Sequence, residues 1–180
     1  MKKYVCIILL FVIGCAVWKP VGGVYKKEDL NFSVEFPQGW MMSSVKNYIV
    51  VTRDGTLLQN ILIERLHVDD ELKNTKKKFK KNMLPQEAAE VILDNISSGQ
   101  DIMNFEIVEN IPIKVSGNPG FKAVFAYKNK DGLRIKSIYY GFMVGEYFYG
   151  IRYIAAQRYY FDKDIKTFEK IVESFKLMKT

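Results

Sequence analysis

Three consecutive segments near the C-terminus constrain the fold of this chain most. They are residues 119–128 (PGFKAVFAYK), 133–144 (LRIKSIYYGFMV) and 147–156 (YFYGIRYIAA), separated by NKDG and by Gly-Glu. Aromatic and β-branched residues favour strands, and turns this short connect antiparallel neighbours. Bulky apolar side chains occupy both alternating positions of the last two segments, which is typical of strands that are covered on both faces. We therefore expect an antiparallel meander at the centre of a sheet.

One helical segment precedes the meander and another follows it. Residues 84–99 (LPQEAAEVILDNISSG) place Pro85 in a first turn and repeat apolar residues at helical spacing. Residues 161–178 (FDKDIKTFEKIVESFKLM) carry an apolar stripe opposite lysines and glutamates. Because one helix before the meander and one after it can cover the sheet, the sequence predicts an α+β fold: an antiparallel sheet flanked by helices, an α/β sandwich.

The segments before the meander supply further strands. Residues 30–36 alternate between apolar and polar side chains, and we expect Pro37 and Gly39 to end this strand and Trp40 to return to the core. Three more segments have strand character: 46–55, 57–68 and 104–117, the last with Pro112 at an edge or a bulge. Residues 69–84 form a polar connection.

Two motifs and the meander together resemble a known fold. The chain opens its folded part with "FSVEFPQGW" (residues 32–40) and closes it with "FEKIVESFK" (residues 168–176). This combination resembles the PsbP-like fold, which is shared by extrinsic photosystem II subunits, DcrB-like bacterial envelope proteins and small lipoproteins. The resemblance covers residues 28–178. It implies a PsbP-like α/β sandwich and a non-enzymatic accessory or binding role, but its motifs are structural and assign no functional residue.

The N-terminus resembles a lipoprotein export signal. Lys2 and Lys3 precede an apolar stretch, Val5 to Ile13, and the sequence Val-Ile-Gly-Cys ends at Cys15. This order resembles the bacterial lipobox, and the resemblance implies that Cys15 receives a diacylglycerol and becomes the first residue after cleavage. Two acyl chains are what stable membrane anchoring requires.

Two alternatives to the lipobox remain open. The uncharged run Tyr4–Trp18 would reach only about 22 Å as a helix, short of the roughly 30 Å hydrocarbon core. A short uncleaved anchor is therefore less favoured than a signal peptide, and a plain secretory signal with a chance cysteine is the second alternative. We expect this layout: residues 1–14 a lipoprotein signal peptide, 15–27 the lipidated cysteine and a tether, and 28–180 a single domain.

This layout predicts the location and the chemistry of the mature chain. Cleavage before Cys15 would remove Lys2 and Lys3 and lower the formal net charge from +7 to +5. Cys6 would leave with the signal, so the core has no disulfide to rely on. The protein would lie in the cell envelope, held at a membrane by its lipid and facing the periplasm or the exterior.

The polar connection contains the densest charge of the chain. Six lysines lie within nine residues: Lys73, Lys76, Lys77, Lys78, Lys80 and Lys81. Three interpretations of these lysines remain open. They belong to a solvated loop, they contact anionic lipid headgroups while Phe79 dips into the interface, or they contact an acidic protein. A nucleic-acid partner is not expected, because an exported chain rarely meets one and no arginine-aromatic pattern supports base stacking.

Motifs of catalysis and metal binding are missing from the sequence. His67, Asp69, Asp70 and Glu71 are the only cluster with metal-ligand character, and they lie where a strand ends without a second histidine or cysteine. There is no Gly-x-Ser-x-Gly, no phosphate-binding glycine loop and only one histidine. We expect no metal, no cofactor and no enzymatic activity.

Tyrosines are concentrated in the last strands of the meander. Tyr139, Tyr149 and Tyr153 either pack in the core or line a ligand or partner face. The sequence therefore predicts an envelope accessory factor that acts through contacts with an unidentified envelope protein. The alternative is a binder of a small apolar ligand in a pocket at the aromatic meander.

Overall fold

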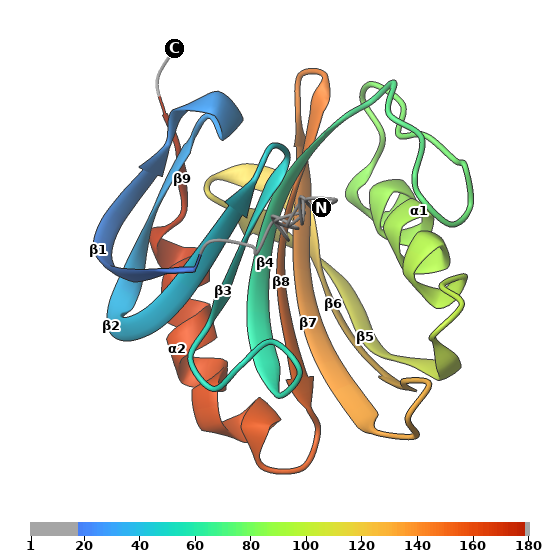
Figure 1. The fold of residues 1–180 in the computed structure, drawn as a ribbon. Coiled ribbons are helices and arrows are strands. Elements are labelled where there is room, and N and C mark those ends of the chain that lie inside the picture. The colour runs from blue at the N-terminus through green and yellow to red at the C-terminus, as the bar shows by residue number, and fades with distance from the viewer. Residues whose placement is uncertain (1–17, 179–180) are drawn as a thin grey trace, which may run out of the picture.

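The predicted meander is the centre of one antiparallel sheet in the computed structural model, which describes residues 18–178 (Figure 1). Within these residues nine strands form the sheet in the order β1-β2-β3-β4-β8-β7-β6-β5, and β9 pairs with β2. The strands are β1 (Lys19–Lys27), β2 (Phe32–Val45), β3 (Tyr48–Thr52), β4 (Gln59–His67), β5 (Met103–Val115), β6 (Asn118–Lys128), β7 (Arg134–Val144), β8 (Tyr147–Ala156) and β9 (Lys176–Leu177). The helices are α1 (Pro85–Ser97) and α2 (Tyr160–Ser174), with a 3-10 turn, η1 (Glu28–Leu30). Cys15 and the predicted signal peptide lie outside the described residues.

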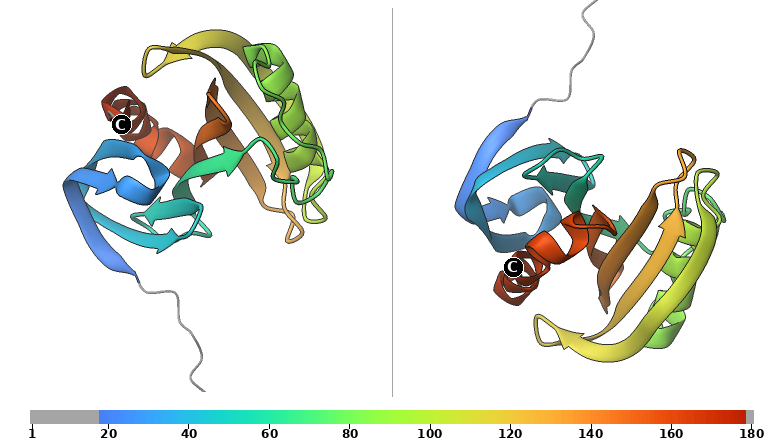
Figure 2. Two further views of the ribbon diagram at one scale, coloured as in Figure 1. Left: turned by 90° about the horizontal axis from the view of Figure 1, so that it is seen from above. Right: turned by 90° about the horizontal axis from the view of Figure 1, so that it is seen from below.

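The two predicted helices flank the sheet, and the structure places them on opposite faces. The sheet curves around α2, and α1 lies against the other face (Figure 2). We call these the α2 side and the α1 side. The α2-side cluster includes Trp40, Ile151 and Phe168, whereas the α1-side cluster includes Leu93 and Phe148. All buried members of both clusters lie between residues 30 and 175, so the described residues contain a complete core.

The central strands are buried on both faces, which confirms the prediction from their composition. Along β7, Ile138, Tyr140 and Phe142 join the α2-side cluster, while Ile135 and Tyr139 join the α1-side cluster. Side chains alternate between the faces of a strand, so two consecutive apolar residues serve the two clusters in turn. The prediction of an antiparallel sheet flanked by helices is confirmed.

The first strand corrects the predicted tether. Residues 19–27 pair with β2, with Lys19 opposite Met42 and Lys27 opposite Phe32. Val21 and Tyr25 pack against the α2-side cluster. The tether prediction is therefore wrong for these residues. Gly23 adopts a φ of +75° beside a register shift between β1 and β2. The glycine therefore permits an irregularity within a strand, whereas the sequence analysis interpreted it as part of a flexible linker.

The second strand continues through the residues that were expected to end it. Pro37 and Gly39 lie inside β2, at the point where its register with β1 shifts and where Gly39 has a φ of +82°. The strand bends here and runs on to Val45 (Figure 1). Trp40 is 1% exposed, which confirms its predicted return to the core.

The two edges of the sheet are β1 and β5. Pro112 lies in β5, which among the described residues pairs only with β6, and an edge strand is where a sheet tolerates a residue without an N–H. The predicted edge position of this proline is confirmed. In the part of the chain from residue 18 to residue 178, neither helix has the length and hydropathy that a membrane crossing requires.

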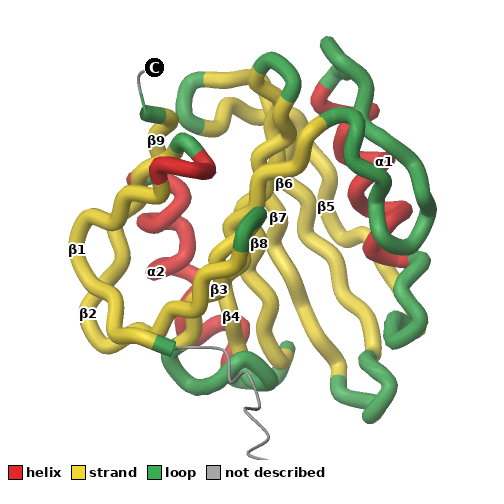
Figure 3. Tube along the Cα trace, turned by 45° about the horizontal axis from the view of Figure 1, so that its top comes forward, coloured by secondary structure: helices red, strands yellow, loops and turns green. Residues whose placement is uncertain are grey.

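The lysine-rich connection is tied to the domain by two buried side chains. It runs alongside α1 (Figure 3), and Leu72 and Phe79 belong to the α1-side cluster. The ring of Phe79 stacks on Phe148 with 4.3 Å between centroids. The main-chain N–H of Asn74 donates to Oδ1 of Asn95 on α1 at 2.9 Å. Phe79 is 3% exposed, so the expectation that it dips into a lipid interface is wrong.

Replacing Phe79 by alanine tests its role in the core. Phe79→Ala removes a stacked, buried ring and should lower the free energy of unfolding by about 3–5 kcal/mol. The matched control is Lys78→Ala, because the neighbouring side chain is exposed. Urea unfolding followed by circular dichroism measures both. Equal stabilities of the two variants would show that the loop is not held by Phe79.

Candidate functional site

A groove of about 750 Å³ lies on the α1 side of the sheet. It exists because α1 packs over β5, β6 and β7 and leaves the adjoining part of this face open. We call this hollow the α1-side groove. Its floor comes from four neighbouring strands and consists of Leu62, Glu64, Tyr127, Tyr139 and Arg152. Its walls come from the start of the lysine-rich loop, from α1 and from residues 98–102.

Polar groups meet on the floor of the groove. The Tyr139 hydroxyl donates a hydrogen bond to the Glu64 carboxyl at 2.7 Å. Nε of Arg152 donates to the Ser137 hydroxyl at 3.0 Å, and its guanidinium lies 5.1 Å from the centre of the Phe125 ring. One Nη of the same guanidinium donates a longer hydrogen bond, 3.5 Å, to the Tyr127 hydroxyl on the groove floor. The arrangement can bind a molecule that combines a polar group with an apolar body.

The contact between Tyr139 and Glu64 requires a glycine beneath it. In the sheet, Gly150 on β8 pairs with Glu64 on β4. A Cβ atom at Gly150 would lie 2.1 Å from the Tyr139 hydroxyl oxygen. The phenol therefore crosses the strand where no side chain stands in its way, and any larger residue at position 150 would displace it.

Burial changes the protonation of both partners. Withdrawal of water raises the pKa of Glu64, although the Tyr139 hydrogen bond and the Arg152 charge act in the opposite direction. Burial also raises the pKa of Tyr139, and the nearby Glu64 carboxylate adds to this effect. Glu64 therefore takes up a proton more readily than an exposed glutamate, and Tyr139 stays a hydrogen-bond donor.

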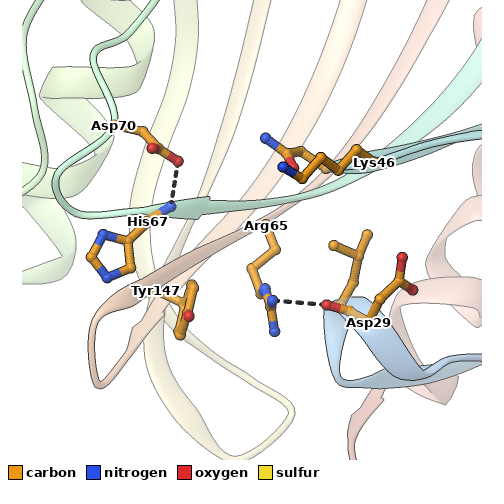
Figure 4. Close-up of a pocket in the computed structure, with 8 residues that line it drawn as sticks. Asp29, Lys46, Arg65, His67, Asp70 and Tyr147 are labelled. Carbon is orange, nitrogen blue, oxygen red and sulfur yellow. Dashed lines mark hydrogen bonds between the residues drawn. The ribbon is translucent and has the colours of Figure 1, made fainter.

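A second hollow, of about 490 Å³, lies on the other side of β4 (Figure 4). Adjacent residues of a strand point to opposite faces, so Arg65 and His67 enter this hollow while Glu64 enters the groove. Arg65 lies 4.3 Å from the centre of the Tyr147 ring and donates to the main-chain oxygen of Asp29 at 2.8 Å. These two contacts fix the Arg65 guanidinium against the wall of the second hollow.

The cluster at the end of β4 orders the loop that follows it. The N–H of Asp69 donates to Nδ1 of His67 at 3.2 Å, and the N–H of His67 donates to the Asp70 carboxylate at 3.0 Å. Nε2 of His67 lies 3.6 Å from Glu146. Within residues 18–178, no three His, Cys, Asp or Glu side chains are placed to hold a metal ion. Asp69 and Asp70 act here as turn-forming side chains.

The lysines of the run differ in their surroundings. Lys77 pairs with Asp94 on α1 at 2.8 Å, and Lys81 pairs with Glu146. Four others are exposed and have no carboxylate within 4 Å among the described residues: Lys73, Lys76, Lys78 and Lys80. Lys73 also lines the α1-side groove.

The structure places the three predicted tyrosines in the core. Tyr139, Tyr149 and Tyr153 are 1%, 3% and 0% exposed. Tyr149 stacks on Phe142, and the Tyr153 hydroxyl donates to the main-chain oxygen of Tyr160. The predicted ligand or partner face is therefore wrong for Tyr149 and Tyr153. Tyr139 is also packed, but its hydroxyl end belongs to the groove floor.

Sequence reasoning did not single out Glu64 or Arg152. A signal for them exists, because each is a charged residue inside a mostly apolar strand segment, ILIERL and YGIRYI. Charged residues are rarely enclosed unless a partner compensates them, so a charge in such a segment indicates a candidate site residue.

The pH dependence of stability tests the environment of Glu64. Because the folded state raises its pKa above the ordinary value of 4.5, Glu64 favours the fold when protonated, and this advantage is lost as the pH rises through the folded pKa. The free energy of unfolding of the native chain minus that of Glu64→Gln should therefore fall as the pH rises from about 4.5. Urea unfolding at several pH values measures it. Glu90→Gln on the exposed face of α1 is the control, and parallel pH profiles for all three chains would contradict the prediction.

Comparison with known proteins places the fold. No protein-family model and no curated protein sequence matches this chain. Among solved structures, cyanobacterial PsbP from Synechocystis sp. PCC 6803 superposes with a TM-score of 0.59 at 13% identity, over 92% of this chain and 95% of that one. The Saccharomyces cerevisiae Ran-binding protein Mog1p gives a TM-score of 0.59 at 10% identity, over 92% and 97%. LpqN, involved in cell envelope biogenesis of Mycobacterium tuberculosis, gives 0.57 at 12% identity, over 91% of each chain.

These likenesses cover nearly the whole length of each protein. At identities of 10–13% they establish the architecture and leave activity open. The chain therefore has the PsbP/Mog1-like fold, an antiparallel sheet with two helices.

Proposed function

We propose that this protein is an exported lipoprotein, fastened to a membrane through Cys15, that serves as a non-catalytic accessory factor of the cell envelope. The division of the chain carries this proposal. All features of the export signal precede residue 16, and the sheet begins at Lys19. Cleavage before Cys15 would therefore remove no residue of the described sheet, which is compatible with a lipobox at residues 12–15. The neighbour LpqN, whose role is in cell envelope biogenesis, adds support for this location.

The edge strand β5 supports a role in protein contacts. Four of its apolar side chains are exposed: Met103 (44%), Ile107 (51%), Val108 (58%) and Ile111 (43%). One side of this strand has no neighbour in the described sheet, so its main-chain groups are free to pair with an added strand. An envelope protein that adds a strand here would bury these side chains at the same time.

The α1-side groove supports a second candidate function, binding of a small amphipathic molecule. The Arg152 guanidinium suits a carboxylate or phosphate group, and Leu62, Leu66 and Ile92 suit an alkyl body.

Leu62→Trp, which fills the groove, should abolish any rise in unfolding temperature that dodecanoate causes in the native chain. Leu57→Trp on the exposed turn after β3 is the control. An equal rise in both variants would contradict binding in the groove.

Changing the anchoring residue tests the proposed function. Cys15→Ser removes the sulfur that would carry the diacylglycerol, so the variant should leave the membrane fraction or retain its uncut signal. Cell fractionation followed by immunoblotting measures both the location and the size of the product. Val12→Leu, which keeps an aliphatic residue in the lipobox, is the control and should behave as the native chain does. A Cys15→Ser protein that fractionates and migrates like the native chain would contradict the lipoprotein assignment.

A further inference from the structure

We propose that the domain rests on the bilayer with the α1 side of its sheet, so that the outer face of β2, β3 and β4 and the lysine-rich loop meet the lipid surface. This inference rests on the lipid anchor of the proposed function and adds to it a defined orientation. Three observations carry it: the length of chain after Cys15, the uncovered apolar face beside the start of β1, and the position of the unpaired lysines.

The chain between the anchor and the sheet is too short for free tumbling. Four residue steps separate Cys15 from Lys19, and a polypeptide spans at most about 3.6 Å per residue, so Lys19 lies within roughly 14 Å of the modified cysteine. A tether to residue 28 would have allowed more than three times this distance. The surface around the start of β1 must therefore lie close to the headgroups.

The start of β1 lies on the side of the molecule away from α2 (Figure 2). Within residues 18–178, no helix covers this part of the α1 side, because α1 packs over β5, β6 and β7. The outward positions of β2 and β3 alternate with the core positions Met42, Ile49 and Val51. Exposed apolar side chains occur at these outward positions and just before β1: Trp18 (38%), Val45 (46%) and Tyr48 (37%). Met41, Val50 and Leu62 lie partly exposed on the same face.

The lysine-rich loop lies on this same side. Leu72 and Phe79 fix it to the α1-side cluster, so the lysines around them project from the α1 side of the domain. Four of them lack a carboxylate partner among residues 18–178, and their charge is available to anionic headgroups. This attraction weakens beyond a Debye length, which is about 10 Å at 0.1 M salt. The short link to the anchor helps to keep the lysines within this distance of the headgroups.

The opposite side of the domain fits a lipid surface less well. The outer face of α2 alternates Lys166 and Lys170 with Glu169 and Glu173, so it has little net charge and no exposed apolar row. Contact through the α1 side also turns the α1-side groove toward the bilayer, which gives its amphipathic lining direct access to lipid-derived molecules.

Fluorescence quenching by lipids measures the orientation. A chain that begins at Cys15 has no other thiol, since Cys6 lies upstream, and it contains the complete core described above. This thiol is coupled to a maleimide lipid in vesicles with anionic headgroups and lipids brominated near the headgroup. Two variants in a Trp18→Phe background report opposite sides: Tyr48→Trp on the α1 side and Lys166→Trp on α2. We expect severalfold stronger quenching of Tyr48→Trp, with buried Trp40 as the common background.

The contribution of the lysines is read in the same vesicles. Lys76→Gln with Lys78→Gln should reduce the quenching of Tyr48→Trp severalfold, and the matched pair Lys166→Gln with Lys170→Gln should leave it unchanged. Equal quenching at the two reporter positions, or stronger quenching at position 166, overturns the orientation. An equal effect of the two lysine pairs overturns the role of the loop. Chemical coupling makes these readings independent of lipidation in the cell, so loss of the native anchor would appear only in the fractionation of Cys15→Ser.

Discussion

Burial of β7 and β8 on both faces is the constraint from which the rest of the structure follows. Their aromatic side chains point alternately to the α2 side and the α1 side, so each face needs its own cover. Helix α2 fills the concave face, whereas α1 reaches only β5, β6 and β7 on the other. Packing occupies most of the aromatic residues. The surfaces left for function are the α1-side groove next to α1, the outer face of β2, β3 and β4, and the free edge of β5.

The elements that could be predicted from sequence are those whose pattern is local. The three meander strands, the two helices and the edge position of Pro112 each follow from residues that are neighbours in the chain. The role of residues 19–27 could not be predicted, because Gly23 has the same composition signal in a linker and in a strand irregularity, and only pairing with β2 distinguishes them. The bend of β2 at Gly39 was missed for the same reason.

The candidate site was less visible in the sequence than the fold. Glu64, Tyr139 and Gly150 are far apart in the chain and meet only through the register of β4, β8 and β7. Composition placed Phe79 among lysines and suggested exposure, but its ring is enclosed because the loop folds back onto Phe148. Tyrosine clustering left core packing and a binding face both open, and in the structure the three tyrosines pack between strands that are covered on both sides.

A sequence that resembles an export signal ends at Cys15, the sheet begins at Lys19, and a face with apolar and basic side chains lies next to that starting point. All three fit a domain that works against a membrane surface, and the first is the one on which the others depend. The intact mass of the protein purified from its native membrane tests it most directly. The account predicts a chain that begins at Cys15 and carries the added mass of a diacylglycerol. A chain that retains Met1, or one whose Cys15 is unmodified, would contradict it.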